Sequence, residues 1–188
     1  QYTAMVLPAF EYGTETPRAE LAKIKVREAV AKALPESFQQ LRECFRVAKP
    51  AKCRVFKSNT DTHYTTNYDK WWRAPERYRI QCFHSLRYEP YLVLPNSNST
   101  PSFDERFLGY GKNKIQWIQH LRLTGFSFYV LPQAFVIHCP HPESASRQNW
   151  EAYKSKKDRL FRDFIRDRLK NASVRTRMCK HTNWGLVK

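Results

Sequence analysis

The sequence predicts an α/β domain in which short strands and amphipathic helices pack around one core. Short apolar runs such as residues 126–131 have the length of buried strands. Residues 112–122 instead repeat apolar side chains at spacings of three and four, which indicates a helix with one buried face. The chain has 188 residues, 41% hydrophobic and 14% aromatic. It is therefore large enough to bury a real core as a single domain.

The first third of the chain is expected to contain one buried strand, two helices and one edge strand. Pro35 is expected to stop the first helix, because proline lacks the backbone donor that a helix needs. In chain order, the expected elements are a strand at 2–10, a loop at 13–17, helices at 18–34 and 36–47, an edge strand at 53–56 and a polar turn region at 58–67.

An aromatic segment interleaved with basic residues follows. Its members are Tyr64, Tyr68, Trp71, Trp72 and Tyr78, alternating with Lys70, Arg73, Arg77 and Arg79. Aromatic rings beside arginine can stack on bases or on sugar faces. The commoner role of such rings is half-buried packing against a sheet, and we favour that interpretation.

The second half continues the mixed pattern and ends in a long basic helix. The expected elements are strands at 79–83 and 91–94, an exposed loop at 95–102, a helix at 112–122, strands at 126–131 and 134–139, a helix from Ser144 and an irregular basic tail from Ala172. The last helix has an apolar stripe made of Trp150, Tyr153, Leu160, Phe161, Phe164, Ile165 and Leu169. Its charges predict i,i+4 pairs, Asp158 with Arg162 and Arg159 with Asp163.

The charge is strongly positive, with 33 Lys and Arg against 17 Asp and Glu, a net charge of +16. Such a surface suits a polyanionic partner, or it is simply solvated. The usual nucleic-acid-binding motifs do not occur. No apolar run approaches the ~20 residues of a membrane span, and residues 1–13 lack the pattern of a signal peptide. The chain starts as though in the middle of a fold, which suggests that earlier sequence has been removed.

Cysteines and glycosylation sequons bear on the compartment. Five cysteines are widely spread and none forms a CxxC pair, which argues against a zinc ribbon. One or two disulfides with one remaining thiol would suit an oxidising compartment. Sequons occur at Asn98 and Asn171 and are weak indicators of a secretory lumen.

The strongest chemical signal lies in residues 101–144. This stretch begins with the adjacent carboxylates Asp104 and Glu105, and a Gly109-Tyr110-Gly111 turn leads from them into a helix. It ends at His138 and His141. A Gly-x-Gly turn before a helix can present backbone N–H groups to phosphate, although most such turns have no ligand. Carboxylates and imidazoles are both ligands for a divalent metal.

Several motifs resemble the LARGE-like glycosyltransferases of family 49. One match is Phe103-Asp104-Glu105-Arg106-Phe107-Leu108-Gly109-Tyr110-Gly111-Lys112-Asn113-Lys114. Others are Val6-x-Pro8-Ala9-Phe10-Glu11, His63-x-x-Thr66-Asn67-Tyr68-x-x-Trp71, Glu89-Pro90-Tyr91, and Val130-Leu131-Pro132-x-Ala134-Phe135-x-Ile137-His138-x-Pro140-His141. The matches keep their order along roughly residues 2–170.

The resemblance implies the C-terminal, mixed-sheet portion of a GT-A fold, which transfers a sugar from a UDP-sugar with a divalent metal, usually Mn²⁺. Related enzymes build a glycan of alternating xylose and glucuronic acid with inversion. The metal-binding histidine of the family falls on His138. Asp104 is the candidate base for the acceptor hydroxyl, and Glu105 is the second candidate.

The same resemblance assigns the remaining candidate residues. Gly109, Gly111, Lys114 and His141 are expected on the side of the UDP-sugar diphosphate. His63, Asn67 and Trp71 are expected to line the acceptor side. Residues 1–172 are expected to form the partial glycosyltransferase domain, with 173–188 as a basic tail.

One departure from the family pattern limits the expected function. The Asp-x-Asp metal motif does not occur in these residues, and in the family it precedes the strand that resembles 2–10. The chain is therefore expected to be the acceptor-side half of a glucuronyl- or xylosyl-type transferase, inactive alone and resident in the Golgi lumen. The alternative is a non-catalytic structural subunit of a large organellar complex, for example mitochondrial. Its charge would then contact RNA, anionic lipid or acidic proteins.

Overall fold

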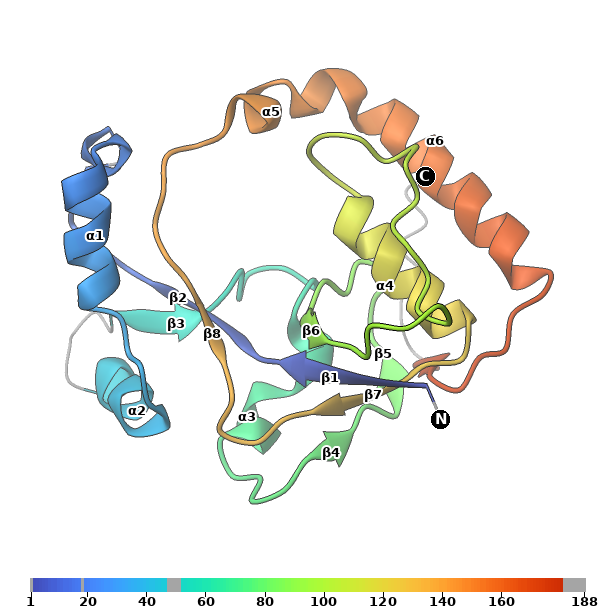
Figure 1. Cartoon of the computed structure of the whole chain (residues 1–188), viewed down its shortest axis with the longest axis horizontal. Helices are drawn as coiled ribbons and strands as arrows, with labels where there is room; N and C mark the ends of the chain where they lie inside the picture. Colours follow the sequence, from blue (N-terminus) through green and yellow to red (C-terminus); the bar gives the residue numbers. More distant parts are fainter. Residues whose placement is uncertain (1, 18, 47–51, 181–188) are drawn as a thin grey trace.

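The computed structural model describes residues 2–17, 19–46 and 52–180 and shows a mixed α/β architecture (Figure 1). Its strands are Thr3–Leu7 (β1), Ala9–Tyr12 (β2), Cys53–Val55 (β3), Tyr78–Arg79 (β4), Cys82–Phe83 (β5), Tyr91–Val93 (β6), Ser127–Val130 (β7), Val136–His138 (β8) and Arg177–Met178 (β9). Its α-helices are Ile24–Lys32 (α1), Phe38–Arg46 (α2), Tyr68–Trp71 (α3), Asn113–Leu123 (α4), Ala145–Gln148 (α5) and Trp150–Leu169 (α6), with 3-10 turns at Glu20–Ala22 and Tyr64–Thr66. In this described part, no helix is long and apolar enough to cross a bilayer.

Two mixed sheets continue one another through the centre of the molecule. The first has the strand order β4-β7-β1-β6, and the second has the order β3-β2-β8. β1 runs parallel to β7, and β2 runs parallel to β8. The edge position predicted for residues 53–56 is confirmed by β3, which pairs only with β2 among the described strands.

Proline divides the strand that was predicted as one element over residues 2–10. Pro8 separates β1 from β2, because proline has no N–H to donate to a sheet ladder. Hydrogen bonds still bridge the break, from the Leu131 N–H to the Val6 carbonyl at 3.0 Å and from the Val136 N–H to the Pro8 carbonyl at 2.9 Å. β2 and β8 therefore carry the path of β1 and β7 onward as a second parallel pair.

Aromatic side chains dominate the central core. Trp71, Phe10, Phe83 and Phe128 are each at most 1% exposed, and Phe10 contacts five other aromatic rings. This confirms the interpretation that the aromatic segment mainly packs against a sheet. Tyr64 is the exception in that segment, because it is 68% exposed.

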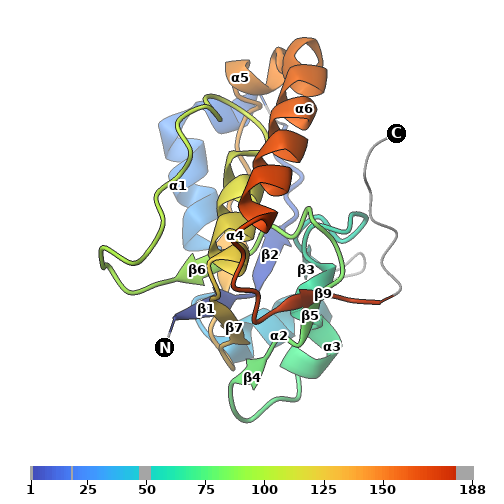
Figure 2. The same cartoon turned by 90° about the vertical axis from the view of Figure 1, so that its right-hand side faces the viewer.

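A second cluster joins α4 to α6, which lie side by side in Figures 1 and 2. Phe161, Phe164 and Ile165 of α6 are buried there against Ile115 and Leu123 of α4. Only the middle of the predicted stripe is covered, since Tyr153 and Leu169, toward its ends, are 57% and 51% exposed.

The charged pairs on α6 differ from the predicted i,i+4 pairs. The Asp158 carboxylate pairs with Lys112 Nζ at 2.8 Å, and both side chains are nearly buried. The Asp163 carboxylate pairs with Arg166 at 2.6 Å. The predicted partners Arg162 and Arg159 were wrong, because Lys112 pairs with Asp158 and Arg166 pairs with Asp163 in their place.

Two disulfides form, and one thiol remains, as the cysteine count suggested. Cys44 is joined to Cys53, and Cys82 to Cys179, while Cys139 is free and half-buried. The first disulfide ties α2 to the edge strand β3. The second holds β9 beside β5.

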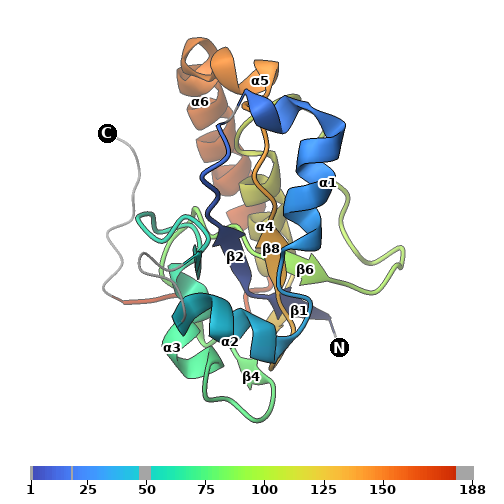
Figure 3. The same ribbon diagram turned by 90° about the vertical axis from the view of Figure 1, so that its left-hand side faces the viewer.

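Three segments differ from the expected elements. The helix expected at 18–34 is interrupted where Lys23 is extended, so α1 starts only at Ile24 and buries no side chain; Arg18 lies outside the described residues. Figure 3 shows α1 and α2 at the end of the molecule that carries β2 and β8. The strand expected at 79–83 is split between two sheets as β4 and β5. Residues 173–180 of the expected irregular tail include β9 and the buried Thr176.

Candidate functional site

His138, the predicted metal ligand, ends β8 on the half-buried rim of the second sheet. The parallel register places it opposite Glu11 of β2, whose carboxylate pairs with Arg54 at 2.5 Å. A short strand thus delivers the imidazole to a point where the chain leaves the sheet. Loops that leave a rigid sheet commonly carry functional side chains.

Aromatic contacts fix the orientation of His138. Its ring stacks on Phe56 with a centroid distance of 4.7 Å and meets the His141 ring at 5.0 Å. Phe56 also contacts His63 at 5.3 Å. Burial lowers the pKa of His138, and the neighbouring His141 lowers it further. The imidazole is therefore neutral at pH 7 and keeps a lone pair for a metal.

His63, predicted on the acceptor side, lies beneath this surface. It is 2% exposed, and its Nε2 atom has no hydrogen-bond partner. Burial lowers the pKa of His63 to about 3, and the charges of Lys114 and Lys57 add to that effect. The uncharged His63 ring packs against Phe56. Because it is buried, it cannot itself contact a sugar acceptor that binds at the surface.

The buried His63 predicts acid-sensitive stability. The unfolded chain gains a proton here below pH 6.5 and the folded chain only near pH 3. Stability is therefore lost as the pH falls between these values, by at most about 1.4 kcal/mol per pH unit. Urea unfolding at pH 7.5, 6.5, 5.5 and 4.5 measures this slope. His63→Gln should make the slope shallower, whereas the exposed His84→Gln should not; equal slopes in the two variants would contradict the assignment.

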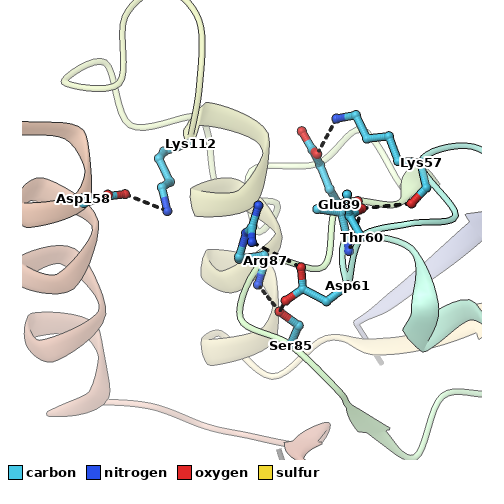
Figure 4. Close-up of polar contacts among 9 residues, drawn as sticks. Lys57, Thr60, Asp61, Ser85, Arg87, Glu89, Lys112 and Asp158 are labelled. Carbon is cyan, nitrogen blue, oxygen red and sulfur yellow. Dashed lines mark hydrogen bonds and ion pairs between the residues drawn. The ribbon is translucent and has the colours of Figure 1, made fainter. Parts of the chain in front are cut away.

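Two lysines and one carboxylate complete the cluster, and two of these residues were missed as site residues. Glu89 lies between Lys57 and Lys114, with N···O distances of 3.2 and 3.9 Å (Figure 4 shows the Lys57 contact). Lys114 Nζ also lies 4.2 Å from the centroid of the Tyr91 ring. Lys114 was predicted, but Lys57 and Glu89 were not. The match at Glu89-Pro90-Tyr91 was the signal that could have indicated Glu89.

The Gly-x-Gly turn is held against α6 and against the short helix α5 before it, where Arg147 lies 5.1 Å from the Tyr110 ring centroid. Gly109 and Gly111 have positive φ angles of 70° and 88°. A Cβ atom on Gly111 would lie 2.0 Å from the Trp150 ring, and Tyr110 meets the same ring at 5.7 Å. The Lys112–Asp158 pair anchors the turn just after the second glycine (Figure 4). The packing against Trp150 is therefore sufficient to explain why position 111 is a glycine, without a role in phosphate binding.

The predicted base Asp104 lies elsewhere. Arg106 holds both of its carboxylate oxygens, with Nε at 2.9 Å and Nη2 at 2.5 Å. The hydrogen bonds from Arg106 lower the pKa of Asp104, which makes it a weaker base. Within the described residues, no hydrogen bond, ion pair or ring contact joins Asp104 or the exposed Glu105 to the histidine cluster.

Two predicted acceptor residues have structural roles. Trp71 is 1% exposed, and its indole N–H donates to the Leu131 carbonyl at 2.8 Å, so it lies in the core instead of on an acceptor surface. Asn67 adopts a left-handed conformation, with φ 57°, and its side chain caps α3 by accepting from the Lys70 N–H. His141 is exposed and bonds to the Pro142 carbonyl through Nδ1.

Metal ligands at His138 are incomplete. In the described segments, one group of three close potential ligands exists, namely Cys82, His84 and Cys179, but its two sulfurs are joined in the disulfide. A neutral imidazole suits Mn²⁺ as one ligand, with His141 as its neighbour. The carboxylate opposite His138, that of Glu11, is paired with Arg54.

Two cavities in the described part of the chain have no histidine in their lining. One, of about 500 Å³, is lined by Arg106, Leu123, Thr124, Phe164, Asp167, Arg168, Asn171 and Ser173. The other, of about 440 Å³, is lined by Leu34, Pro35, Glu36, Gln133, Ala134, Phe135 and Ile137. Neither contains an imidazole, so we place the candidate site at the cluster of His138, His63, Lys57, Glu89 and Lys114.

Comparison with known proteins identifies the family. The model of a family described as "Glycosyl-transferase for dystroglycan", glycosyltransferase family 49, matches residues 1–172. The chain belongs to this family. Its mixed α/β sheets agree with the expected GT-A-type portion, and the resemblance seen in the sequence motifs is confirmed.

Relatives of this family 49 domain are much longer than the chain itself. The rat xylosyl- and glucuronyltransferase LARGE2 is 39% identical over 98 residues, which cover 52% of this chain and 14% of the rat protein. The glycosyltransferase-like protein gnt14 of Dictyostelium discoideum is 44% identical over 82 residues, covering 44% of this chain and 12% of the relative. The glycosyltransferase-like protein LARGE of Caenorhabditis elegans is 28% identical over 152 residues, covering 80% and 22%.

Proposed function

We propose that this family 49 domain is the acceptor-side half of a metal-dependent transferase that moves a glucuronyl or xylosyl group from UDP to a glycan. The observation that carries the proposal is the position of His138. Its neutral, half-exposed imidazole lies in the field of Lys57 and Lys114. A metal ligand next to two cations suits a nucleotide diphosphate, which carries several negative charges.

The residues divide into two roles. His138, with His141 beside it, would hold Mn²⁺ together with carboxylates from the preceding part of the protein. Bound there, the ion would act as a Lewis acid that offsets charge on the leaving diphosphate. Lys57 and Lys114 would bind the diphosphate oxygens as point charges. The Gly109 turn lies just before α4, and Lys114 is in the first turn of that helix.

Location in the Golgi lumen is part of the proposal. Two disulfides support an oxidising compartment, since such bonds are rare in the cytosol. Both sequon asparagines, Asn98 and Asn171, are exposed to solvent and therefore open to modification.

Hydrolysis of UDP-sugars by the complete natural protein, in the presence of Mn²⁺, tests the function. His138→Ala is expected to raise the Mn²⁺ concentration for half-maximal activity at least about tenfold, as losses at metal sites commonly do. His84→Ala is the matched control, because His84 is exposed and lies outside the cluster. Equal Mn²⁺ dependence in wild type and His138→Ala would remove His138 from the metal site.

A basic surface around β4, β5 and β9 favours the alternative, a non-catalytic contact with an acidic partner. Six cations there are exposed and make no ion pair within the described residues, namely Lys70, Arg73, Arg77, Arg79, Arg175 and Arg177. Arg79 reaches across to the Arg175 carbonyl at 3.2 Å, which joins the two ends of this surface. If the complete wild-type protein neither hydrolyses nor transfers any UDP-sugar, the non-catalytic contact with an acidic partner is the function that the basic surface supports.

A further inference from the structure

A carboxylate other than Asp104 is built into the histidine and lysine cluster. Glu89 follows the short loop after β5, and its backbone N–H donates to the Thr62 carbonyl at 2.8 Å, directly beside His63. Its side chain is 19% exposed, so it is held in place and still reaches solvent. We propose that Glu89 is the catalytic base that takes the proton from the acceptor hydroxyl, an inference that rests on the proposed transferase function.

Contacts lead continuously from Glu89 to His138. The Glu89 carboxylate pairs with Lys57, and Lys57 Nζ lies 5.2 Å from the centroid of Phe56. Phe56 in turn stacks on His138. Lys57 and Lys114, the two partners of Glu89, are also the two lysines whose charges lower the pKa of His138 and of His63. Glu89 therefore shares the electrostatic surroundings of the candidate metal ligand.

One oxygen of Glu89 is free to accept a new hydrogen bond. Oε2 accepts from Lys57 Nζ at 3.2 Å. Oε1 lies 3.9 Å from Lys114 Nζ, which is beyond hydrogen-bond distance, and accepts no hydrogen bond from any described residue. A carboxylate oxygen with unused lone pairs is suited to accept a hydroxyl proton.

Asp104 is arranged in the opposite way. Both of its oxygens accept from Arg106, and its backbone N–H points to the Gln116 side chain on the buried face of α4. A planar guanidinium that binds both oxygens leaves little room for an acceptor hydroxyl and orients the loop instead. We therefore treat Asp104 as a positioning residue of the turn before α4.

The step that Glu89 would catalyse is an inverting substitution at the anomeric carbon. The acceptor hydroxyl oxygen forms a bond to this carbon while the bond from the carbon to the diphosphate oxygen breaks. The electron pair of the broken bond leaves with UDP. The hydroxyl proton goes to Oε1 of Glu89, and the protonated carboxyl then returns it to solvent.

The test uses the complete natural protein with Mn²⁺, UDP-glucuronic acid or UDP-xylose, and aryl xylosides or glucuronides as acceptors. Glu89→Gln keeps the shape of the side chain and removes its basicity. We expect kcat to fall by about 100-fold or more, with the calorimetric affinity for UDP and Mn²⁺ changed less than about threefold. Glu76→Gln is the matched control, because it makes the same substitution at an exposed residue on the loop before β4. This variant should keep wild-type kcat.

The pH profile separates catalysis from positioning. Wild-type kcat should fall on the acid side as the base becomes protonated, and Glu89→Gln should lose that acid limb. A Glu89→Gln variant with kcat within threefold of wild type would overturn the inference and leave the transferase function standing. So would an Asp104→Asn variant that alone loses the acid limb. If wild type transfers and hydrolyses nothing, the proposed function and this inference fall together.

Discussion

Removing the disulfide between Cys82 and Cys179 by a double alanine substitution is expected to lower the free energy of unfolding by about 4–5 kcal/mol. The two cysteines are 97 residues apart, so the bond restricts the unfolded chain over more than half of its length. Without it, β9 is attached to β5 by a ladder of only two residue pairs. Urea unfolding of wild type and variant, both under non-reducing conditions, measures the loss.

The other disulfide supplies a control for this explanation. Cys44 and Cys53 are 9 residues apart, and a loop of that size predicts a smaller loss, below about 3 kcal/mol. The double alanine variant at Cys44 and Cys53 should therefore unfold at a higher urea concentration than the variant at Cys82 and Cys179. The reverse order would show that loop length does not control the stability of this domain.

Gly111→Ala should lower the free energy of unfolding by about 2–5 kcal/mol, because it disturbs the contact between the glycine turn and α6. Two costs add: a non-glycine residue at φ 88° is strained by about 1–2 kcal/mol, and the new methyl group would lie 2.0 Å from the Trp150 ring, where overpacking costs about 1–3 kcal/mol. The loss appears as a lower midpoint of urea unfolding.

Gly109→Ala is the matched control two residues earlier. It has a similar φ of 70°, but its added Cβ atom meets nothing within 4 Å. Only the backbone strain of about 1–2 kcal/mol remains. If both variants lose the same stability, the Trp150 contact is not what requires glycine at position 111. If Gly111→Ala also lost UDP binding while remaining folded, the turn would have the phosphate-binding role predicted from its sequence.

Local patterns were sufficient for most of the fold. The helix at 112–122 appears as Asn113–Leu123, and the strands at 126–131 and 134–139 appear as Ser127–Val130 and Val136–His138, each within a few residues. These predictions rest on periodicity and on proline, which act within the segment itself. The predicted strand at 79–83 was wrong because its alternation is real but its two halves pair with different partners, β7 and β9.

Site residues were harder to predict than elements. His138, His63 and Lys114 were predicted from the family motifs; the structure brings them into one cluster, and their roles stay predictions. Trp71 and Asn67 belong to motifs of the same family, yet one is sealed in the core and the other caps a helix. A motif records which residue stands at a position, and burial decides whether that residue can touch a ligand.

The sequence by itself determined the family, the mixed α/β class and the candidate imidazole at His138, since ordered motifs and local periodicity are visible without a fold. Only the tertiary structure decided which carboxylate joins the lysines next to that imidazole. Lys57 and Glu89 are 32 residues apart in the chain and meet because the sheets and α4 bring their loops together. The partner of Asp104, in contrast, is Arg106, which is only two residues away in the sequence. Such pairings depend on long-range packing, which no local pattern encodes.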